Sequence, residues 1–172
     1  MTPVPRRIRV AVDRLAPAPD ARLLEVGPGP GVAMALICRE LTDGHITGLD
    51  RSATAIARAE KRLASYLEVG RADLQHRDLA GFHGDGRTFD QVFAIDVNVF
   101  WTDPAHAEVA RLRDLVADDG VVHLFADPPD GAADRLAAAR AAGALASAGF
   151  TVVTEVVDGV VCVTGRPGPA RP

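Results

Sequence analysis

The stretch LLEVGPGPG, at Leu23–Gly31, decides the fold of this chain. A short apolar run is followed by a carboxylate and then by Gly27, Gly29 and Gly31, with prolines between them. A glycine-rich turn after a buried strand lies at the carboxyl edge of a parallel sheet, where the backbone can approach a ligand closely. The stretch therefore predicts a strand, a ligand-binding turn and the beginning of a helix.

The spacing of these glycines does not match the common phosphate-binding patterns. The dinucleotide fingerprint G-x-G-x-x-G requires a third glycine where Val32 stands. The Walker A pattern requires a Lys-Ser/Thr pair, and none follows this loop. The pattern that remains is E-V-G-x-G-x-G, in which Glu25 precedes the first glycine by two positions. It indicates a ligand that has no pyrophosphate.

Composition limits the class of protein. The chain has 172 residues, 48% of them hydrophobic and 24% charged, which suits one domain with a substantial core. The net charge of −4 argues against a nucleic-acid partner, because phosphates favour a basic surface. Cys38 and Cys162 match no metal-binding spacing and are expected to be reduced core residues of a cytoplasmic protein. We expect neither a signal peptide nor a membrane-spanning segment.

Short apolar runs alternate with helical periods along the chain, which predicts a parallel sheet with right-handed crossovers. The first helix carries Arg6, Arg7 and Arg9, which are expected to lie on its solvated face. Strands are expected at residues 22–26, 45–50, 72–76, 90–96 and 120–126. Helices are expected at 7–16, at 32–41, after an N-cap at Ser52, at 103–117 with Asp103 as N-cap and Pro104 in the first position, and at 132–148 before Gly149.

The end of the chain departs from this alternation. Two β-type runs flank Asp158-Gly159, a pair that favours a two-residue hairpin turn. The final strand is therefore expected to be antiparallel, which a plain dinucleotide-binding fold does not predict. Residues 78–89 are too few and too rich in glycine to form a full helix. We expect one domain over residues 1–166 and a flexible tail over residues 167–172.

Carboxylates accompany the first three predicted strands. Asp50 ends the second strand, and a carboxylate there can accept from both hydroxyls of a ribose. Asp78 follows the third strand and is a candidate acceptor for an adenine amino group, although Asp73 offers another register. Together with Glu25 these residues would surround an adenosine. The structural alternatives are that the glycines only form the turn and that Asp50 only caps the next helix.

These motifs make the chain resemble the class I S-adenosylmethionine-dependent methyltransferases, particularly the compact small-molecule type. The matching stretches are LLEVGPGPG, ITGLD, HRDL, FDQVFAIDVNVFW and DGVVHLF, and the resemblance spans about residues 7–166. It implies an α/β fold with a doubly wound, mostly parallel, seven-stranded Rossmann-like sheet whose final strand is reversed. It also implies S-adenosyl-L-methionine as the cofactor and methyl transfer to an O, N or C atom of a small molecule.

The resemblance further implies cofactor contacts at the ends of the first four strands. These residues are Glu25, Gly27, Gly29 and Gly31 at the methionine and ribose, Asp50 at the ribose hydroxyls with Arg51 beside the adenine, Asp78 at the adenine amino group with Leu79 on the ring, and the backbone of Ile95 and Asp96 at the cofactor's amino group.

By the same resemblance, the stretch DVNVFWTDP, which begins at Asp96, borders the methyl group and the acceptor. Asp96 is a candidate general base, and Asn98 is a candidate for orienting the acceptor. Phe100 and Trp101 are candidates for an apolar wall around the sulfonium, because aromatic faces attract cations; the alternative is that both are core residues. Asp127 is a candidate lining residue on the acceptor side. Methyl transfer from a sulfonium depends mainly on alignment, so the sequence leaves the acceptor atom open.

Two other functions stay open at this point. An NAD(P)-dependent oxidoreductase is disfavoured by Val32 and by the final hairpin, and a non-catalytic methyltransferase-like binding domain is the second alternative. The five histidines do not cluster in the sequence, so no metal site is expected. The expected partner is a small-molecule substrate, with no nucleic acid and no membrane, and a homodimer is one option. The acceptor site is expected to be shallow, covered by the N-terminal helix, or completed by a second subunit.

Overall fold

A seven-stranded sheet forms the centre of the protein in a computed structural model that describes residues 3–102, 105–128 and 135–168. The strands are β1 (Arg22–Val26), β2 (His45–Asp50), β3 (Ala72–His76), β4 (Phe89–Ile95), β5 (Val116–Ala126), β6 (Phe150–Val157) and β7 (Val160–Pro167). Their order is β3-β2-β1-β4-β5-β7-β6. Strands β1 to β5 pair in parallel, and β7 is antiparallel to both β5 and β6. The predicted fold, including the reversed final strand, is confirmed.

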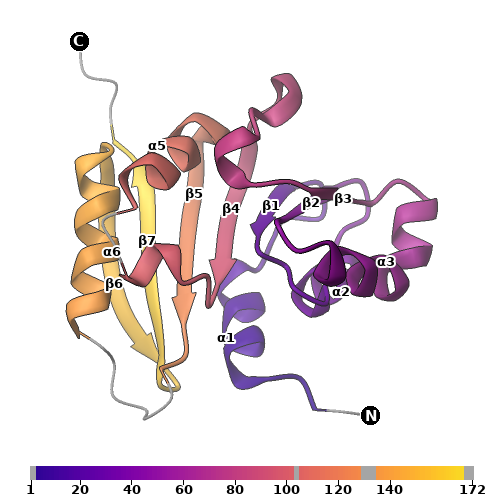
Figure 1. The fold of residues 1–172 in the computed structure, drawn as a ribbon, viewed down its shortest axis with the longest axis horizontal. Coiled ribbons are helices and arrows are strands. Elements are labelled where there is room, and N and C mark those ends of the chain that lie inside the picture. Colours follow the sequence, from indigo (N-terminus) through magenta and orange to yellow (C-terminus); the bar gives the residue numbers. More distant parts are fainter. Residues whose placement is uncertain (1–2, 103–104, 129–134, 169–172) are drawn as a thin grey trace.

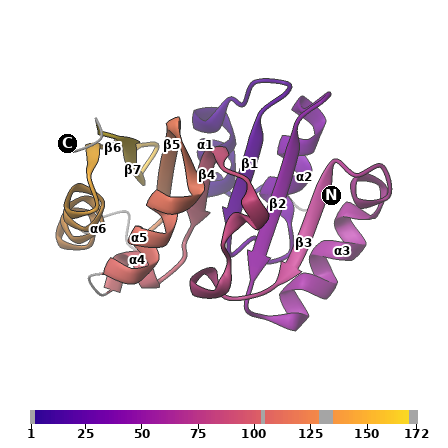
Figure 2. The same cartoon turned by 90° about the horizontal axis from the view of Figure 1, so that it is seen from above.

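Helices cover both faces of this sheet (Figures 1 and 2). Successive residues of a strand point to opposite faces, so Leu23 packs in one core cluster and Leu24 in the other. The helices are α1 (Arg6–Leu15), α2 (Val32–Glu40), α3 (Ala53–Glu68), α4 (Val99–Thr102), α5 (His106–Leu115) and α6 (Arg135–Ser147), with two short 3₁₀ turns, η1 (Leu79–Gly81) and η2 (Gly84–Gly86). Helices α1, α2 and α3 pack in the same core cluster as Leu23, and helices α4, α5 and α6 pack in the same core cluster as Leu24.

The first half of the chain follows the sequence expectations closely. Strands β1, β2 and β3 have the predicted bounds, and β4 is displaced by one residue. Ser52 is the N-cap of α3, since its hydroxyl accepts from the backbone N–H of Ala55 at 3.3 Å. Residues 78–89 form no full helix, only η1 and η2.

The connection between β4 and β5 differs from the expectation. A four-residue helix, α4, precedes α5, and α5 runs only from His106 to Leu115 with Ala105 as its N-cap. The predicted cap Asp103 and Pro104 lie outside the described residues. Strand β5 begins at Val116 rather than at Gly120, because Val116 already pairs with Phe89 before a register shift in the ladder. Gly120 fits beside this irregularity, since a Cβ there would lie 2.8 Å from the Asp90 carbonyl oxygen.

The C-terminal hairpin has the predicted form. Asp158 and Gly159 both have positive φ, 49° and 78°, and Val157 pairs directly with Val160. This is the conformation of a two-residue type I′ turn, for which Asp-Gly is a preferred pair. Helix α6 ends at Ser147, and Gly149 has φ 89°, as expected just beyond a helix end; residues 132–134 of the predicted helix lie outside the described part.

Cys38 and Cys162 are free and buried, as predicted. In the described part of the chain, no helix combines the length and the apolar character needed to cross a bilayer.

Candidate functional site

The glycine loop connects β1 to α2 at the carboxyl edge of the sheet. Gly27 has φ 72°, and its N–H donates to the carbonyl of Leu49 at 2.8 Å, which draws the loop against β2. A Cβ at Gly27 would lie 2.7 Å from Cγ2 of Val97. The positive φ and this close approach together require glycine at this position, because any side chain would be strained and would clash with Val97. Gly31 also has φ 72° and forms the N-cap of α2.

Asp50 connects this loop to the beginning of α3. Its Oδ2 accepts from the Gly29 N–H at 3.1 Å, and its Oδ1 accepts from the Ser52 N–H at 2.8 Å. Asp50 therefore does more than cap a helix, and the cap itself is the Ser52 hydroxyl. Each carboxylate oxygen has a second lone pair, so both can still accept from a ligand.

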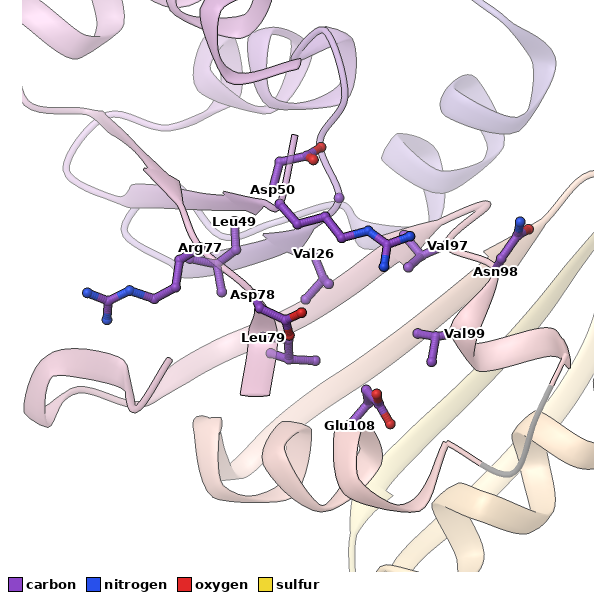
Figure 3. Close-up of a pocket in the computed structure, with 12 residues that line it drawn as sticks. Val26, Leu49, Asp50, Arg77, Asp78, Leu79, Val97, Asn98, Val99 and Glu108 are labelled. Atoms are coloured by element: carbon purple, nitrogen blue, oxygen red, sulfur yellow. The ribbon is translucent and has the colours of Figure 1, made fainter. Parts of the chain in front are cut away.

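A cavity of about 170 Å³, here called the strand-end cavity, lies where β1, β2 and β4 end (Figure 3). The structure brings Gly27, Asp50 and Asp78 together at this cavity, with Arg51 and Leu79 beside them. Asp78 caps η1, because its Oδ1 accepts from the Ala80 N–H at 2.9 Å. The remaining lining residues are Val26, Leu49, Arg77, Val97, Asn98, Val99 and Glu108.

Asp73, the other register considered from the sequence, lies within β3 and accepts from the Gln75 amide at 2.9 Å. It does not line the strand-end cavity. Of the two aspartates, Asp78 is therefore the one at the cavity.

A second cavity, of about 160 Å³ and here called the loop cavity, lies between the glycine loop and α1. Glu25 borders it and is only 2% exposed. Burial, and secondarily the nearby charge of Asp50, raises the pKa of Glu25 from 4.5 to about 8. Its Oε2 has no hydrogen-bond partner among the described residues. The other lining residues are Arg7, Ile8, Gly27, Pro28, Gly29, Pro30, Val32, Ala33, Ile95 and Asp96.

A third cavity, of about 330 Å³ and here called the tryptophan cavity, has Trp101 in its wall. Phe100 is 1% exposed and lines none of these three cavities. Both aromatic residues belong to the core cluster of Leu24, which supports the alternative that both are core residues, and Trp101 borders this cavity in addition. The other lining residues are Asp96, Asn98, Ala126, Asp127, Pro128, Ala137 and Val161.

The three cavities meet pairwise at single residues. Gly27 borders the strand-end and loop cavities, Asn98 borders the strand-end and tryptophan cavities, and Asp96 borders the loop and tryptophan cavities. The three cavities are therefore adjacent to one another at the carboxyl edge of the sheet.

Asp96 is held by contacts from three directions. Its N–H donates to the Phe125 carbonyl, its Oδ1 accepts from the Asp127 N–H, both at 2.9 Å, and its Oδ2 lies 2.8 Å from Nε of Arg7. It also has φ 54°, which is unusual for a residue other than glycine. Both carboxylate oxygens of Asp96 are therefore engaged in contacts with other residues.

Two of the three arginines expected on the solvated face of α1 form ion pairs instead, whereas Arg9 is exposed as predicted. Arg7 pairs with Asp96, and Arg6 forms an ion pair with Asp127. The first turn of α1 therefore lies at the carboxyl edge of the sheet and borders the loop cavity through Arg7 and Ile8.

Sequence reasoning missed three polar residues at these cavities, Arg7, Arg77 and Glu108. Arg7 was expected only on the solvated face of the first helix, and Arg77 and Glu108 were not singled out. Arg7 and Glu108 have no local sequence signal, because both reach the site through the packing of a helix, whereas Arg77 directly precedes Asp78.

The histidines do not form a site. Within the described ranges, no group of three or more His, Cys, Asp or Glu side chains could hold a metal ion. His123 hydrogen-bonds to Thr164 at 3.2 Å, and burial, followed by the charge of Arg166, lowers its pKa to about 4. His83 is exposed in the loop before β4.

Comparison with known proteins gives a consistent result. A family model described as "Methyltransferase domain" matches residues 24–122, from β1 into β5. A search of curated proteins found no match. The matching stretch contains the glycine loop, Asp50, Asp78 and Asn98.

Several solved structures share the fold. The "DhpI-SAH complex structure" has 23% sequence identity and a TM-score of 0.73, over 94% of this chain and 84% of that chain. A precorrin-6y C5,15-methyltransferase from Geobacter metallireducens has 16% identity and a TM-score of 0.75, over 94% and 87%. The [4+2]-cyclase SpnF has 16% identity and a TM-score of 0.78, over 96% and 82%. The same architecture thus occurs in a methyltransferase and in a cyclase.

Proposed function

The chain belongs to the methyltransferase domain family, and from this premise we propose that it transfers the methyl group of S-adenosylmethionine to a small-molecule acceptor. The observation that carries the proposal is the meeting of the three cavities at Gly27, Asp96 and Asn98. Two of them suit the two ends of the cofactor, and the third suits an acceptor beside its reactive centre.

The strand-end cavity would hold the adenosine. Asp50 would accept from the ribose hydroxyls through its remaining lone pairs, and Asp78 would accept from the adenine amino group. Leu79, which is 5% exposed, would pack against the ring, with Arg51 beside it. Val26 and Leu49 complete the apolar surface that a purine requires.

The loop cavity would hold the methionine end. The fit is supported by the buried Oε2 of Glu25, which has no partner in the described structure and would accept a hydrogen bond from an ammonium group. Gly27 and Gly29 would let the backbone approach the cofactor, and the backbone of Ile95 and Asp96 would accept from the same ammonium.

The tryptophan cavity would hold the acceptor. When bound, S-adenosylmethionine supplies an electrophilic methyl group on a positively charged sulfur. Trp101 would face this charge, and Asn98, at the border of two cavities, would orient the acceptor. Asp127 would line the far side, held there by Arg6. Placing the attacking atom in line with the methyl group would supply most of the rate, so no free base is required.

The first experiment is calorimetric titration of the purified protein with S-adenosylhomocysteine, with NADH as the control. S-adenosylhomocysteine is expected to bind with micromolar affinity. NADH is not expected to bind, because the glycine loop lacks the third glycine of the dinucleotide fingerprint. Binding of NADH alone would instead favour the oxidoreductase alternative.

The second experiment separates an enzyme from a binding domain. A panel of small phenols, amines and carboxylic acids is incubated with the protein and methyl-labelled S-adenosylmethionine, and label transfer is measured. Transfer that falls in Asn98→Ala and Trp101→Ala would support catalysis at the tryptophan cavity. S-adenosylhomocysteine binding without transfer to any member would favour the non-catalytic alternative.

A further inference from the structure

Glu108 is a carboxylate at the strand-end cavity that has no role in the assignments above. It lies in the first turn of α5 and is half-buried. Figure 3 shows that it borders the same cavity as Asp78 and Leu79 but comes from a different element. Helix α5 packs against η1, the turn that Asp78 caps. The fold therefore places Glu108 and Asp78 around one part of the cavity.

Glu108 differs from the other carboxylates that line this cavity. Asp50 accepts from two backbone N–H groups and Asp78 from one. In the part of the chain that the structure describes, Glu108 has no hydrogen bond or ion pair. The wall of this cavity includes the apolar residues Leu79, Val97 and Val99. It also includes the side-chain donors Arg51, Arg77 and Asn98, but none of these forms a hydrogen bond or ion pair with Glu108 in the described structure. A carboxylate beside apolar walls is stabilised when a ligand provides the missing donor.

The adenine amino group provides two N–H donors, and two carboxylates can share them. Asp50 lies on the loop side of the cavity, where the ribose is placed, which leaves Asp78 and Glu108 for the base. We propose that Glu108 is a specificity-determining residue that, together with Asp78, binds the adenine amino group and selects adenine over a 6-oxopurine. This inference rests on the proposed cofactor function.

The chemistry of the two bases makes the proposal specific. In a 6-oxopurine, a carbonyl oxygen replaces the amino group. That oxygen cannot donate to either carboxylate and would be repelled by both. A site built to receive donors strongly rejects an analogue that lacks them, because its own polar groups are then left unpaired.

The test compares S-adenosylhomocysteine with its deaminated analogue, S-inosylhomocysteine, by calorimetry. The wild-type protein is expected to prefer the adenosyl compound by at least about thirtyfold. In Glu108→Gln the amide can donate to the 6-oxo group, so the preference is expected to narrow by about tenfold. Glu108→Ala removes the acceptor without adding a donor. It should therefore weaken the binding of S-adenosylhomocysteine more than the binding of S-inosylhomocysteine.

Glu60→Gln on the exposed surface of α3 is the matched control, because it removes one carboxylate that does not line this cavity. It is expected to leave the preference unchanged. A preference that stays the same in both Glu108 variants, while S-adenosylhomocysteine still binds, would overturn the role of Glu108 and leave the proposed function standing. Failure of the wild-type protein to bind S-adenosylhomocysteine would overturn the proposed function and, with it, this inference.

Discussion

The Asp50 carboxylate holds the Gly29 N–H at 3.1 Å, which joins the end of β2 to the middle of the glycine loop. Its other oxygen holds the Ser52 N–H at 2.8 Å. One side chain therefore organises two of the elements that border the strand-end cavity, and the same two oxygens face the place proposed for the ribose. The structural role of Asp50 and the ribose-binding role proposed for it are coupled for this reason.

Asp50→Ala is expected to weaken S-adenosylhomocysteine binding by more than tenfold while the protein still folds. The free energy of unfolding should fall by about 1–2 kcal/mol, because two backbone N–H groups lose their acceptor at a partly solvated position. Asp50→Asn retains one acceptor oxygen, so its affinity and its free energy of unfolding should lie between those of the wild-type protein and of Asp50→Ala. Calorimetry and urea unfolding measure the two effects separately. Wild-type affinity in Asp50→Ala would refute the ribose assignment.

Gly27→Ala is expected to be more harmful than Gly29→Ala. Both glycines have positive φ, so each alanine costs about 1–2 kcal/mol in backbone strain. At Gly27 the new methyl group would also lie 2.7 Å from Cγ2 of Val97, whereas at Gly29 it would meet open space. Urea unfolding should therefore show the larger loss for Gly27→Ala, and Val97→Ala in that background should restore part of it. Equal losses at the two positions would contradict the steric explanation.

Arg7→Gln is expected to weaken S-adenosylhomocysteine binding several-fold, with little effect on stability. Arg7 lines the loop cavity, where the methionine carboxylate of the cofactor would need a cation. Its ion pair with Asp96 is substantially exposed, with 40% and 36% of the two side chains accessible, so its loss should cost less than about 1 kcal/mol.

Arg14→Gln is the matched control for Arg7→Gln. Arg14 lies on the same helix and pairs with Glu155 at similar exposures of 42% and 37%, but it does not line the loop cavity. The two substitutions should change the thermal unfolding temperature by similar amounts. Calorimetry should show weaker S-adenosylhomocysteine binding for Arg7→Gln and unchanged binding for Arg14→Gln. An equal loss of affinity in the two variants would argue that α1 acts only through its general packing.

Glu25 is expected to make stability fall as pH rises. Its folded-state pKa of about 8 lies above its ordinary value of 4.5, so between these pH values the folded protein retains a proton that the unfolded chain releases. The stabilising contribution is complete below about pH 4.5 and is lost as the pH rises to about 8, by up to about 5 kcal/mol. Glu25→Gln should lack this dependence. Urea unfolding of both proteins across this range provides the test, and a constant difference between them would show that Glu25 does not titrate as proposed.

The parts of the fold that the sequence predicted well depend on short stretches. The bounds of β1 and β2 follow short, largely apolar runs that end at Gly27 and at Asp50. The Ser52 cap and the Asp158-Gly159 turn follow from the conformations that these residues adopt within a few positions. For the same reason the glycine loop, Asp50 and Asp78 could be located at one edge of the sheet before their contacts were known.

Other parts depend on residues far apart in the chain. Strand β5 begins early because Val116 meets Phe89, and Arg6 reaches Asp127 across 121 positions. Which of Phe100 and Trp101 faces a cavity is decided by how the four-residue helix α4 lies on the core. No local pattern encodes these contacts.

The sequence by itself thus determined the first three strands, the glycine loop and the acidic residues that follow it, because apolar periodicity and turn chemistry act locally. Only the tertiary structure decided that Arg7 closes the loop cavity, that Glu108 joins Asp78, and that Asp96 stands where two cavities meet. These placements depend on which strands are neighbours and on the rotation of each helix against the sheet, and both are settled only when the whole core packs.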